Sequence, residues 1–233
     1  MRVKLNKALY GLREAPKIWF DTIKAFFIRH GFTQSTLDEC LFYKRYLDKT
    51  SIDVLLHVDD GKGTTDTPTR AFYLLKALKA QFKVLKVTQG NKHNYLSMVF
   101  RYNREDNTVN ITMPTYAKKI AESYETPERG NPLTPHTPTI FKVQEAAKLN
   151  CEDQAKFHST VMKIMYYALC VRLDILCTVN FLSTRTRLGT ATFEDKNKLI
   201  RLVQFINKTH TDGITLGGGT SNNIRIFAYA DAA

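Results

Sequence analysis

The feature that most constrains this chain is a short apolar run that ends in two adjacent acids. Apolar residues dominate positions 52–58, and Asp59, Asp60 and Gly61 follow directly. A run of this length, rich in branched side chains and bounded by turn residues, is typical of a β-strand. With residues 62–65 as the returning strand, the sequence predicts a β-hairpin that carries both carboxylates at its tip.

Paired carboxylates on a rigid turn favour metal-assisted phosphoryl transfer. Hard cations such as Mg²⁺ take oxygen ligands, and two-metal enzymes need those ligands held near one point. A second interpretation is purely structural, because Asp-Gly is a favoured turn dipeptide in which glycine accepts a positive φ. The hairpin residues alone leave both interpretations open.

Helices are predicted on both sides of the hairpin. Pro16 suits a first helical turn, and large apolar residues follow at helical spacing as far as Gly31 (Trp19, Ile23, Phe26 and Phe27). A second helix is predicted to begin at Thr67-Pro68. This order of helix, strands and helix fits an α+β fold.

The second half of the chain is predicted to be mainly helical. Four of the seven prolines fall between residues 126 and 139, where no apolar period is sustained, so a linker is expected there. Helical spacing resumes near Phe157 and again near Leu199, the latter preceded by Thr192 and Asp195 in a capping pattern. Glycines from position 217 then predict a flexible joint before a strand.

The composition points to a polyanionic partner. The chain carries 34 Lys and Arg residues against 22 Asp and Glu, a net charge of +12, which favours nucleic acid through counterion release. A membrane partner is disfavoured, because no segment approaches the roughly 18 uninterrupted apolar residues of a spanning helix, and no secretory signal is visible. The four cysteines form no C-x-x-C pair and indicate a reduced, intracellular protein.

Two segments resemble a known polymerase family. Residues 8–19 read Ala-Leu-Tyr-Gly-Leu-Arg-Glu-Ala-Pro-Lys-Ile-Trp, and residues 57–60 read His-Val-Asp-Asp. In order and spacing they resemble the reverse transcriptase of copia-type long-terminal-repeat retrotransposons, whose usual strings are LYGLKQAP followed by W, and then YVDD.

The resemblance continues along the rest of the chain. Residues 75–82 followed by residues 95–98 resemble a family stretch that ends in a Leu-Gly-Ile type string, with Ser97 at a broken position. Residues 116–120 resemble the helix that follows. Residues 157–174 resemble the stretch YR..VGSLMYLA..TRPDI, with Lys163 in place of a glycine and Leu173 in place of a proline. The last residues resemble the opening strand of the family's ribonuclease H domain and make Asp231 the first of its carboxylates.

The resemblance implies an α+β fold with a partial polymerase palm, an antiparallel sheet with packed helices, followed by a mainly helical thumb and connection region and a terminal strand. We expect the palm and the start of the thumb at residues 1–125 and a Pro/Thr-rich linker at 126–152. The helical connection region is expected at 153–216, and a flexible joint with the first strand of a truncated ribonuclease H-like domain at 217–233.

The resemblance also implies a metal site at the hairpin. In this family the paired acids help hold two Mg²⁺ ions that activate the primer 3′-hydroxyl and neutralise the triphosphate. We expect Asp59 to be the direct ligand, Asp60 to support it, and Val58 to pack beneath the tip. His57 stands where the family has tyrosine, in contact with the primer end.

Other matched positions are expected near the template and the incoming nucleotide. These are Tyr10, Gly11 and Glu14, of which Glu14 replaces a glutamine and adds a negative charge that should weaken binding to a nucleic-acid backbone. The family needs a further Asp upstream of Tyr10, and residues 1–7 contain no acid, so the chain is expected to be inactive alone. Asp231 by itself likewise cannot build a two-metal site.

The resulting prediction is a fragment of an RNA-directed DNA polymerase. Its expected partners are an RNA or DNA template with a primer, dNTP and the remainder of the parent polyprotein, in the cytoplasm within a virus-like particle or in the nucleus. One alternative is a catalytically inactive nucleic-acid-binding remnant of a decayed element. Another is an unrelated phosphohydrolase in which acids such as Asp38 or Asp106 join Asp59 and Asp60.

Overall fold

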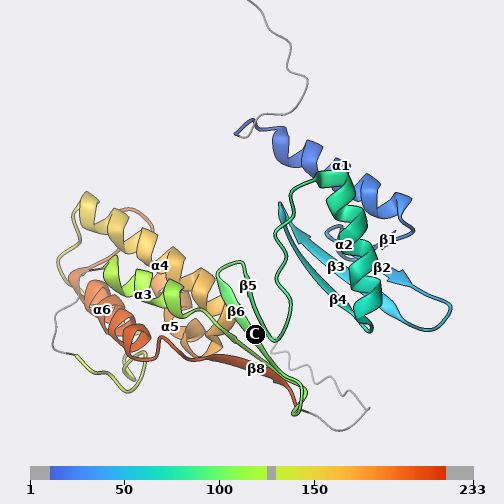
Figure 1. Cartoon of the computed structure of the whole chain (residues 1–233). Coiled ribbons are helices and arrows are strands. Elements are labelled where there is room, and N and C mark those ends of the chain that lie inside the picture. The colour runs from blue at the N-terminus through green and yellow to red at the C-terminus, as the bar shows by residue number, and fades with distance from the viewer. Residues whose placement is uncertain (1–10, 125–129, 219–233) are drawn as a thin grey trace, which may run out of the picture. The chain divides into compact units, whose positions relative to one another are not determined.

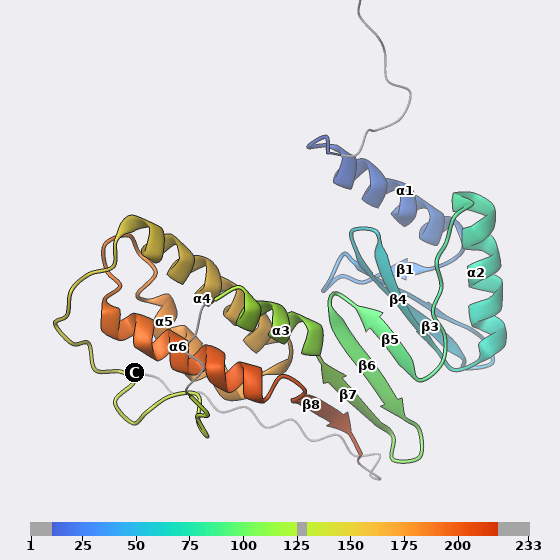
Figure 2. The same ribbon diagram turned by 60° about the vertical axis from the view of Figure 1, so that its left-hand side comes forward.

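The computed structural model describes residues 11–124 and 130–218, which belong to two compact units that divide between Thr88 and Gln89. Each unit combines helices with a four-stranded antiparallel sheet (Figures 1 and 2). The α+β class predicted from the sequence is therefore confirmed.

The first unit packs the two predicted helices on one face of its sheet. Its sheet has the order β1-β2-β3-β4, with every neighbouring pair antiparallel. The elements are α1 (Ala15–Arg29), β1 (Thr33–Gln34), β2 (Leu41–Arg45), β3 (Ser51–His57), β4 (Asp60–Thr65) and α2 (Pro68–Phe82). Both helices and the hairpin lie where the sequence predicts them, although the Thr67 side chain makes no capping hydrogen bond at the start of α2.

The core of the first unit lies on one face of this sheet. Phe26 and Phe27 of α1 pack against Phe42, Ile52 and Val54 of the strands, all at most 6% exposed. Partly buried side chains of α2 complete the cluster (Leu74, Ala77, Leu78 and Phe82). Because alternate residues of a strand face the same side, this packing leaves residues 53, 55 and 57 of β3 on the open face.

The second unit places helices beside a second sheet with the order β5-β6-β7-β8. Its strands are β5 (Lys92–Tyr95), β6 (Met98–Asn103), β7 (Thr108–Thr112) and β8 (Gly213–Gly217). Its helices are α3 (Pro114–Glu122), α4 (Cys151–Val171), the short 3-10 turn η1 (Leu173–Ile175), α5 (Leu176–Ser183) and α6 (Phe193–Lys208). No helix within the described ranges is long and apolar enough to cross a membrane.

Strand β8 is a feature that the sequence patterns miss. After α6 the chain returns to the sheet and pairs with β7, with Ile214 opposite Ile111. A Cβ added at Gly213 would overlap the carbonyl oxygen of Ile111, so the close approach of the two strands requires glycine there. Gly217, the first glycine of the predicted flexible joint, is thus the last residue of the paired strand β8. The strand predicted after these glycines lies outside the described residues.

The predicted linker, residues 126–152, is described from residue 130; its backbone is irregular as far as residue 150, whereas residues 151 and 152 already belong to α4. This segment is attached to the second unit. Ile140 and Leu149 are buried in this unit, and Lys198 of α6 donates to the carbonyl oxygen of Lys142 at 2.7 Å. The compact units divide at Thr88, not at residue 125. The boundaries at 125, 152 and 216 refer to parts of a polymerase and stay predictions.

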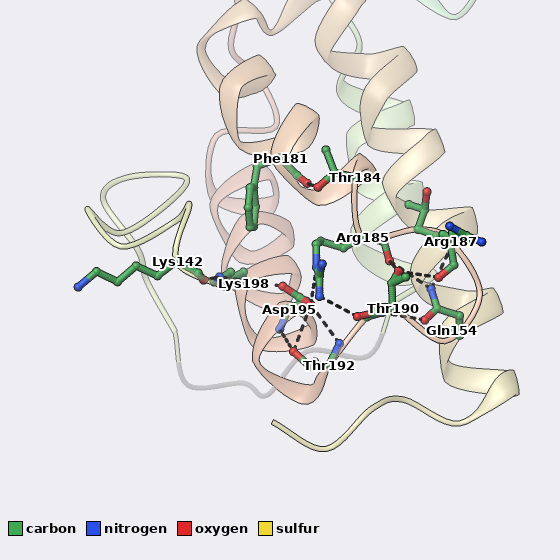
Figure 3. A network of polar contacts seen from close by, with 12 residues as sticks. Lys142, Gln154, Phe181, Thr184, Arg185, Arg187, Thr190, Thr192, Asp195 and Lys198 are labelled. Carbon is green, nitrogen blue, oxygen red and sulfur yellow. Dashed lines mark hydrogen bonds and ion pairs between the residues drawn. The ribbon is translucent and has the colours of Figure 1, made fainter. Parts of the chain in front are cut away.

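A buried polar network joins α6 to the loop that precedes it (Figure 3). Asp195, 2% exposed, accepts from the backbone and hydroxyl of Thr192 at 3.1 Å, which confirms the predicted cap as a capping box. The same carboxylate accepts from Nε of Arg185 at 3.1 Å, and Arg185 also donates to the carbonyl oxygen of Thr190. Gln154 of α4 accepts from the Ala191 amide at 3.2 Å. These contacts hold α4, the loop and α6 together.

A strained turn connects β5 and β6. Tyr95 pairs with Met98, so Leu96 and Ser97 form a two-residue turn in which both have positive φ, 50° and 65°. Such a turn favours Asn and Gly, because other side chains crowd the backbone there. The Tyr166 hydroxyl of α4 donates to the carbonyl oxygen of Leu96 at 3.1 Å and supports the turn. Ser97, at which the chain departs from the family string, thus has a backbone conformation that glycine adopts without strain.

Replacing Asp195 by alanine should destabilise the second unit. The change removes the cap of α6 and leaves the largely buried Arg185 without its carboxylate, so we expect the free energy of unfolding to fall by about 3 kcal/mol. Urea titration followed by far-UV circular dichroism measures this value. Glu194→Ala, in the same helical turn, is the control and should cost less than about 1 kcal/mol. Equal losses in the two variants would contradict the assigned role of the network.

Replacing Ser97 by glycine should stabilise the chain. Glycine removes the strain of positive φ but adds freedom to the unfolded state, so the expected net gain is about 0.5–1 kcal/mol. Thermal and urea unfolding would detect it. The matched change Ser123→Gly, at a residue with φ −81°, should give no gain. A loss of stability in Ser97→Gly would show that the turn is not strained at this position.

Candidate active site

The two acids lie at the tip of the β3–β4 hairpin, as the sequence predicts. His57 pairs with Asp60 across the two-residue connection Val58-Asp59, so Asp59 sits in the turn and Asp60 opens β4, both exposed. Gly61 pairs with Leu56 within the strand. The interpretation of Asp60-Gly61 as the turn dipeptide is therefore wrong, because the turn is formed two residues earlier, at Val58-Asp59.

Val58 has an unusual backbone conformation. It is the first central residue of the turn, and its φ is +55°. Two-residue hairpins with positive φ at this position favour glycine, and a β-branched residue there is strained by about 1–3 kcal/mol. The prediction that Val58 packs beneath the tip is wrong, since this residue is 58% exposed. A bend of the backbone, and not packing of an apolar side chain, shapes the tip.

Trp19 connects the tip to helix α1. Its indole N–H donates to the carbonyl oxygen of Val58 at 2.6 Å. The indole ring meets the Phe82 ring edge-on, with centroids 5.3 Å apart, and packs against the buried cluster of this unit. The two sequence segments that carry the family resemblance are therefore in direct contact. The sequence patterns do not indicate this bond, although the chain's single tryptophan lies within the matched string and was a signal for it.

His57 and Asp60 share the open face of the sheet. Residues directly opposite in neighbouring antiparallel strands project to the same side, and these two form the last pair before the turn. Helices α1 and α2 cover the other face of the sheet, where they pack against Ile52 and Val54 of β3. A ligand that reaches the open face at the tip would meet the imidazole and a carboxylate together.

The other predicted contact residues are only partly described. Gly11 has φ +95° and open space around it, and Glu14 is exposed just before α1, where its carbonyl oxygen accepts from the Ile18 amide. Tyr10 and Asp231 lie outside the described residues. Contact of Tyr10, Gly11 and Glu14 with template or nucleotide stays a prediction.

The carboxylates fit Mg²⁺ as part of a ligand set. They are hard oxygen donors on a short, supported turn, which is the chemistry this cation prefers. Within residues 11–124 and 130–218, however, no three His, Cys, Asp or Glu side chains are grouped so that they could hold a metal ion. Asp38 accepts from the Cys40 amide and Asp106 from the Asn103 side chain, so both acids have local structural partners. The phosphohydrolase alternative thus gains no third ligand.

The family string in the second half has a structural explanation. Arg172, 2% exposed, ends α4 and donates from Nε and Nη2 to both oxygens of Asp174 at 2.8 and 2.7 Å. Its Nη1 donates to the backbone and hydroxyl oxygens of Thr209 at 2.9 Å. Burial alone would lower the pKa of Arg172, but hydrogen bonding, first to Asp174, outweighs it and raises that pKa. This arginine holds the end of α4 against the end of α6.

Comparisons with known proteins support the family resemblance of residues 8–19 and 57–60. The family described as "Reverse transcriptase (RNA-dependent DNA polymerase)" matches residues 2–140, well over half of the chain. The chain is 27% identical over 98% of its length to the Retrovirus-related Pol polyprotein from transposon RE1 of Arabidopsis thaliana. It is 26% identical over 78% of its length to the corresponding polyprotein from transposon TNT 1-94 of Nicotiana tabacum. No solved structure matches the chain significantly.

This chain belongs to the reverse transcriptase (RNA-dependent DNA polymerase) family. The resemblance to copia-type retrotransposon proteins, first seen in residues 8–19 and 57–60, is confirmed by the relatives. The chain spans only 15% and 14% of the length of these two polyproteins.

Replacing Arg172 by lysine should destabilise the second unit. Lysine keeps the charge but cannot donate in parallel to Asp174 and also reach Thr209, so we expect a loss of about 2–3 kcal/mol. Urea unfolding followed by circular dichroism measures the change. Arg187→Lys, at an exposed arginine, should stay within about 0.5 kcal/mol of the parent chain. If Arg172→Lys lost no more stability than Arg187→Lys, the hydrogen bonds from Arg172 to Asp174 and Thr209 would not stabilise the unit.

Proposed function

We propose that this chain is part of the polymerase region of a retrotransposon Pol polyprotein and that its β3–β4 hairpin supplies metal ligands for DNA synthesis. The observation that carries the proposal is the pair of exposed carboxylates on a turn that is hydrogen-bonded to the other matched segment, residues 8–19, through Trp19. Asp59 acts as the direct ligand and Asp60 supports it. Further ligands come from other parts of the polyprotein.

In the proposed reaction the primer 3′-oxygen attacks the α-phosphorus of a dNTP and pyrophosphate leaves. Bound Mg²⁺ would activate the 3′-hydroxyl and offset the charge of the triphosphate. The chain's own residues hold oxygen donors on a fixed backbone, and His57, which shares the face of Asp60, lies against the primer end. The net charge of +12 attracts template and primer.

The proposed division follows the polymerase parts. The first unit, with α1 and α2 on one face of a sheet, provides the palm, and residues up to 125 begin the thumb. Residues 126–152 link this region to the helical connection at 153–216. Residues 217–233 open a ribonuclease H-like domain in which Asp231 is one carboxylate.

A second candidate is a catalytically inactive remnant that binds nucleic acid. Substitutions at matched positions favour it, above all Glu14, which places a carboxylate where the family has an uncharged amide, and Ser97, which has positive φ. The remnant would bind template and primer through its basic charge but would not extend the primer.

Primer extension on an RNA template with Mg²⁺ tests the proposal, and it is measured on the parent polyprotein because the chain alone is expected to be inactive. Asp59→Ala with Asp60→Ala should lower extension about 100-fold or more, because the loss of metal ligands removes several kcal/mol of transition-state stabilisation. The control is Asp38→Ala with Glu39→Ala, an adjacent exposed acidic pair in the same unit, which should leave extension unchanged.

The outcomes separate the candidates. Loss confined to the Asp59/Asp60 variant supports the polymerase, whereas loss in the control pair would favour the site that includes Asp38. Binding of primer and template without extension by the unsubstituted polyprotein supports the remnant. In that case Mn²⁺ titration by electron paramagnetic resonance shows whether the hairpin still binds a cation.

A further inference from the structure

The strain at Val58 requires support from outside the turn. A valine with φ +55° returns to negative φ unless its surroundings hold it, and its own side chain is too exposed to do so. The residues that follow are Asp59 and Asp60, so any change of the Val58 backbone would redirect both carboxylates.

Trp19 is placed to give that support. Its 2.6 Å hydrogen bond ends on the carbonyl oxygen of Val58, which belongs to the peptide group that joins Val58 to Asp59. A donor at this oxygen restrains the rotation of that peptide group, because hydrogen bonds weaken steeply when their angle is lost. The bond therefore restrains the peptide group that connects the strained Val58 to Asp59, the first of the two carboxylates.

The indole itself is held in place. Trp19 lies in the first turns of α1, packs against the cluster that includes Phe26 and Phe27, and meets Phe82 of α2 edge-on. Aromatic side chains with a polar atom commonly combine an apolar body with one directed hydrogen bond. Both helices that cover the sheet thus fix the position of the donor.

We propose that Trp19 is a positioning residue that holds the Val58–Asp59 peptide in its strained conformation and so sets the direction of Asp59 and Asp60. The proposal deepens the proposed function and rests on it only for its catalytic consequence. Trp19 touches neither metal nor substrate; it acts through the Val58 backbone.

The test compares Trp19→Phe with a double variant that removes the need for the bond. Phenylalanine keeps an aromatic ring in the cluster but has no N–H, so amide hydrogen exchange at Asp60, which pairs with His57 next to the turn, should become about 10-fold faster when measured by NMR. Val58→Gly makes positive φ free of strain. In the Trp19→Phe, Val58→Gly chain, exchange at the Asp60 amide should return to within about 3-fold of the parent.

A matched control separates a local effect from general destabilisation. Thr22→Val removes another side-chain hydrogen bond of α1, that to the carbonyl oxygen of Ile18, and should leave exchange at the Asp60 amide unchanged. Exchange at Phe42 and Val54, in the buried strands, should stay at parent rates in all variants. Unchanged exchange at the Asp60 amide in Trp19→Phe, or no recovery on adding Val58→Gly, would overturn the proposal.

Primer extension adds the catalytic readout. Trp19→Phe should lower kcat about 10-fold with little change in the KM for dNTP, and Val58→Gly should restore it. If the unsubstituted polyprotein does not extend primers, the proposed function fails while the exchange measurements still decide whether Trp19 holds the turn. If extension is normal in Trp19→Phe although exchange is faster, the bond orders the tip without serving catalysis, and the positioning role is refuted.

Discussion

The side-chain register of the β3–β4 hairpin is the constraint on which the candidate site depends. Burial of Ile52 and Val54 under α1 and α2 decides which residues of β3 face the core. The two-residue turn then brings Asp59 and Asp60 to the end of the sheet, with Asp60 opposite His57. A shift of one residue would exchange the faces of the whole strand and turn Asp53 toward the core.

Both units use an aromatic polar group to support a strained turn. In the first, the Trp19 indole bonds the carbonyl oxygen of Val58, and in the second the Tyr166 hydroxyl bonds that of Leu96. In each case the carbonyl belongs to the first central residue of a two-residue hairpin, and that residue has positive φ. Packing of an aromatic ring in one element thereby stabilises backbone geometry in another.

Sequence patterns predicted local structure well and long-range structure poorly. The spacing of Trp19, Ile23, Phe26 and Phe27 and the Thr192-Asp195 cap depend on neighbours within one helix, and the structure agrees with them. Strand β8 was missed because its partner, β7, lies about a hundred residues earlier and no local period marks it. The role of Arg172 was missed for the same reason, since its contact Thr209 follows two further helices.

The features of the candidate site also separate into those that local sequence predicts and those that packing decides. The hairpin and its adjacent acids could be read directly from residues 52–65, because strand alternation and turn chemistry act between near neighbours. The position of the turn at Val58-Asp59, the exposure of Val58 and the bond from Trp19 could not, because they arise where α1 and α2 pack on the sheet. Local chemistry placed two carboxylates in one turn, and only packing between distant segments decided how that turn is held.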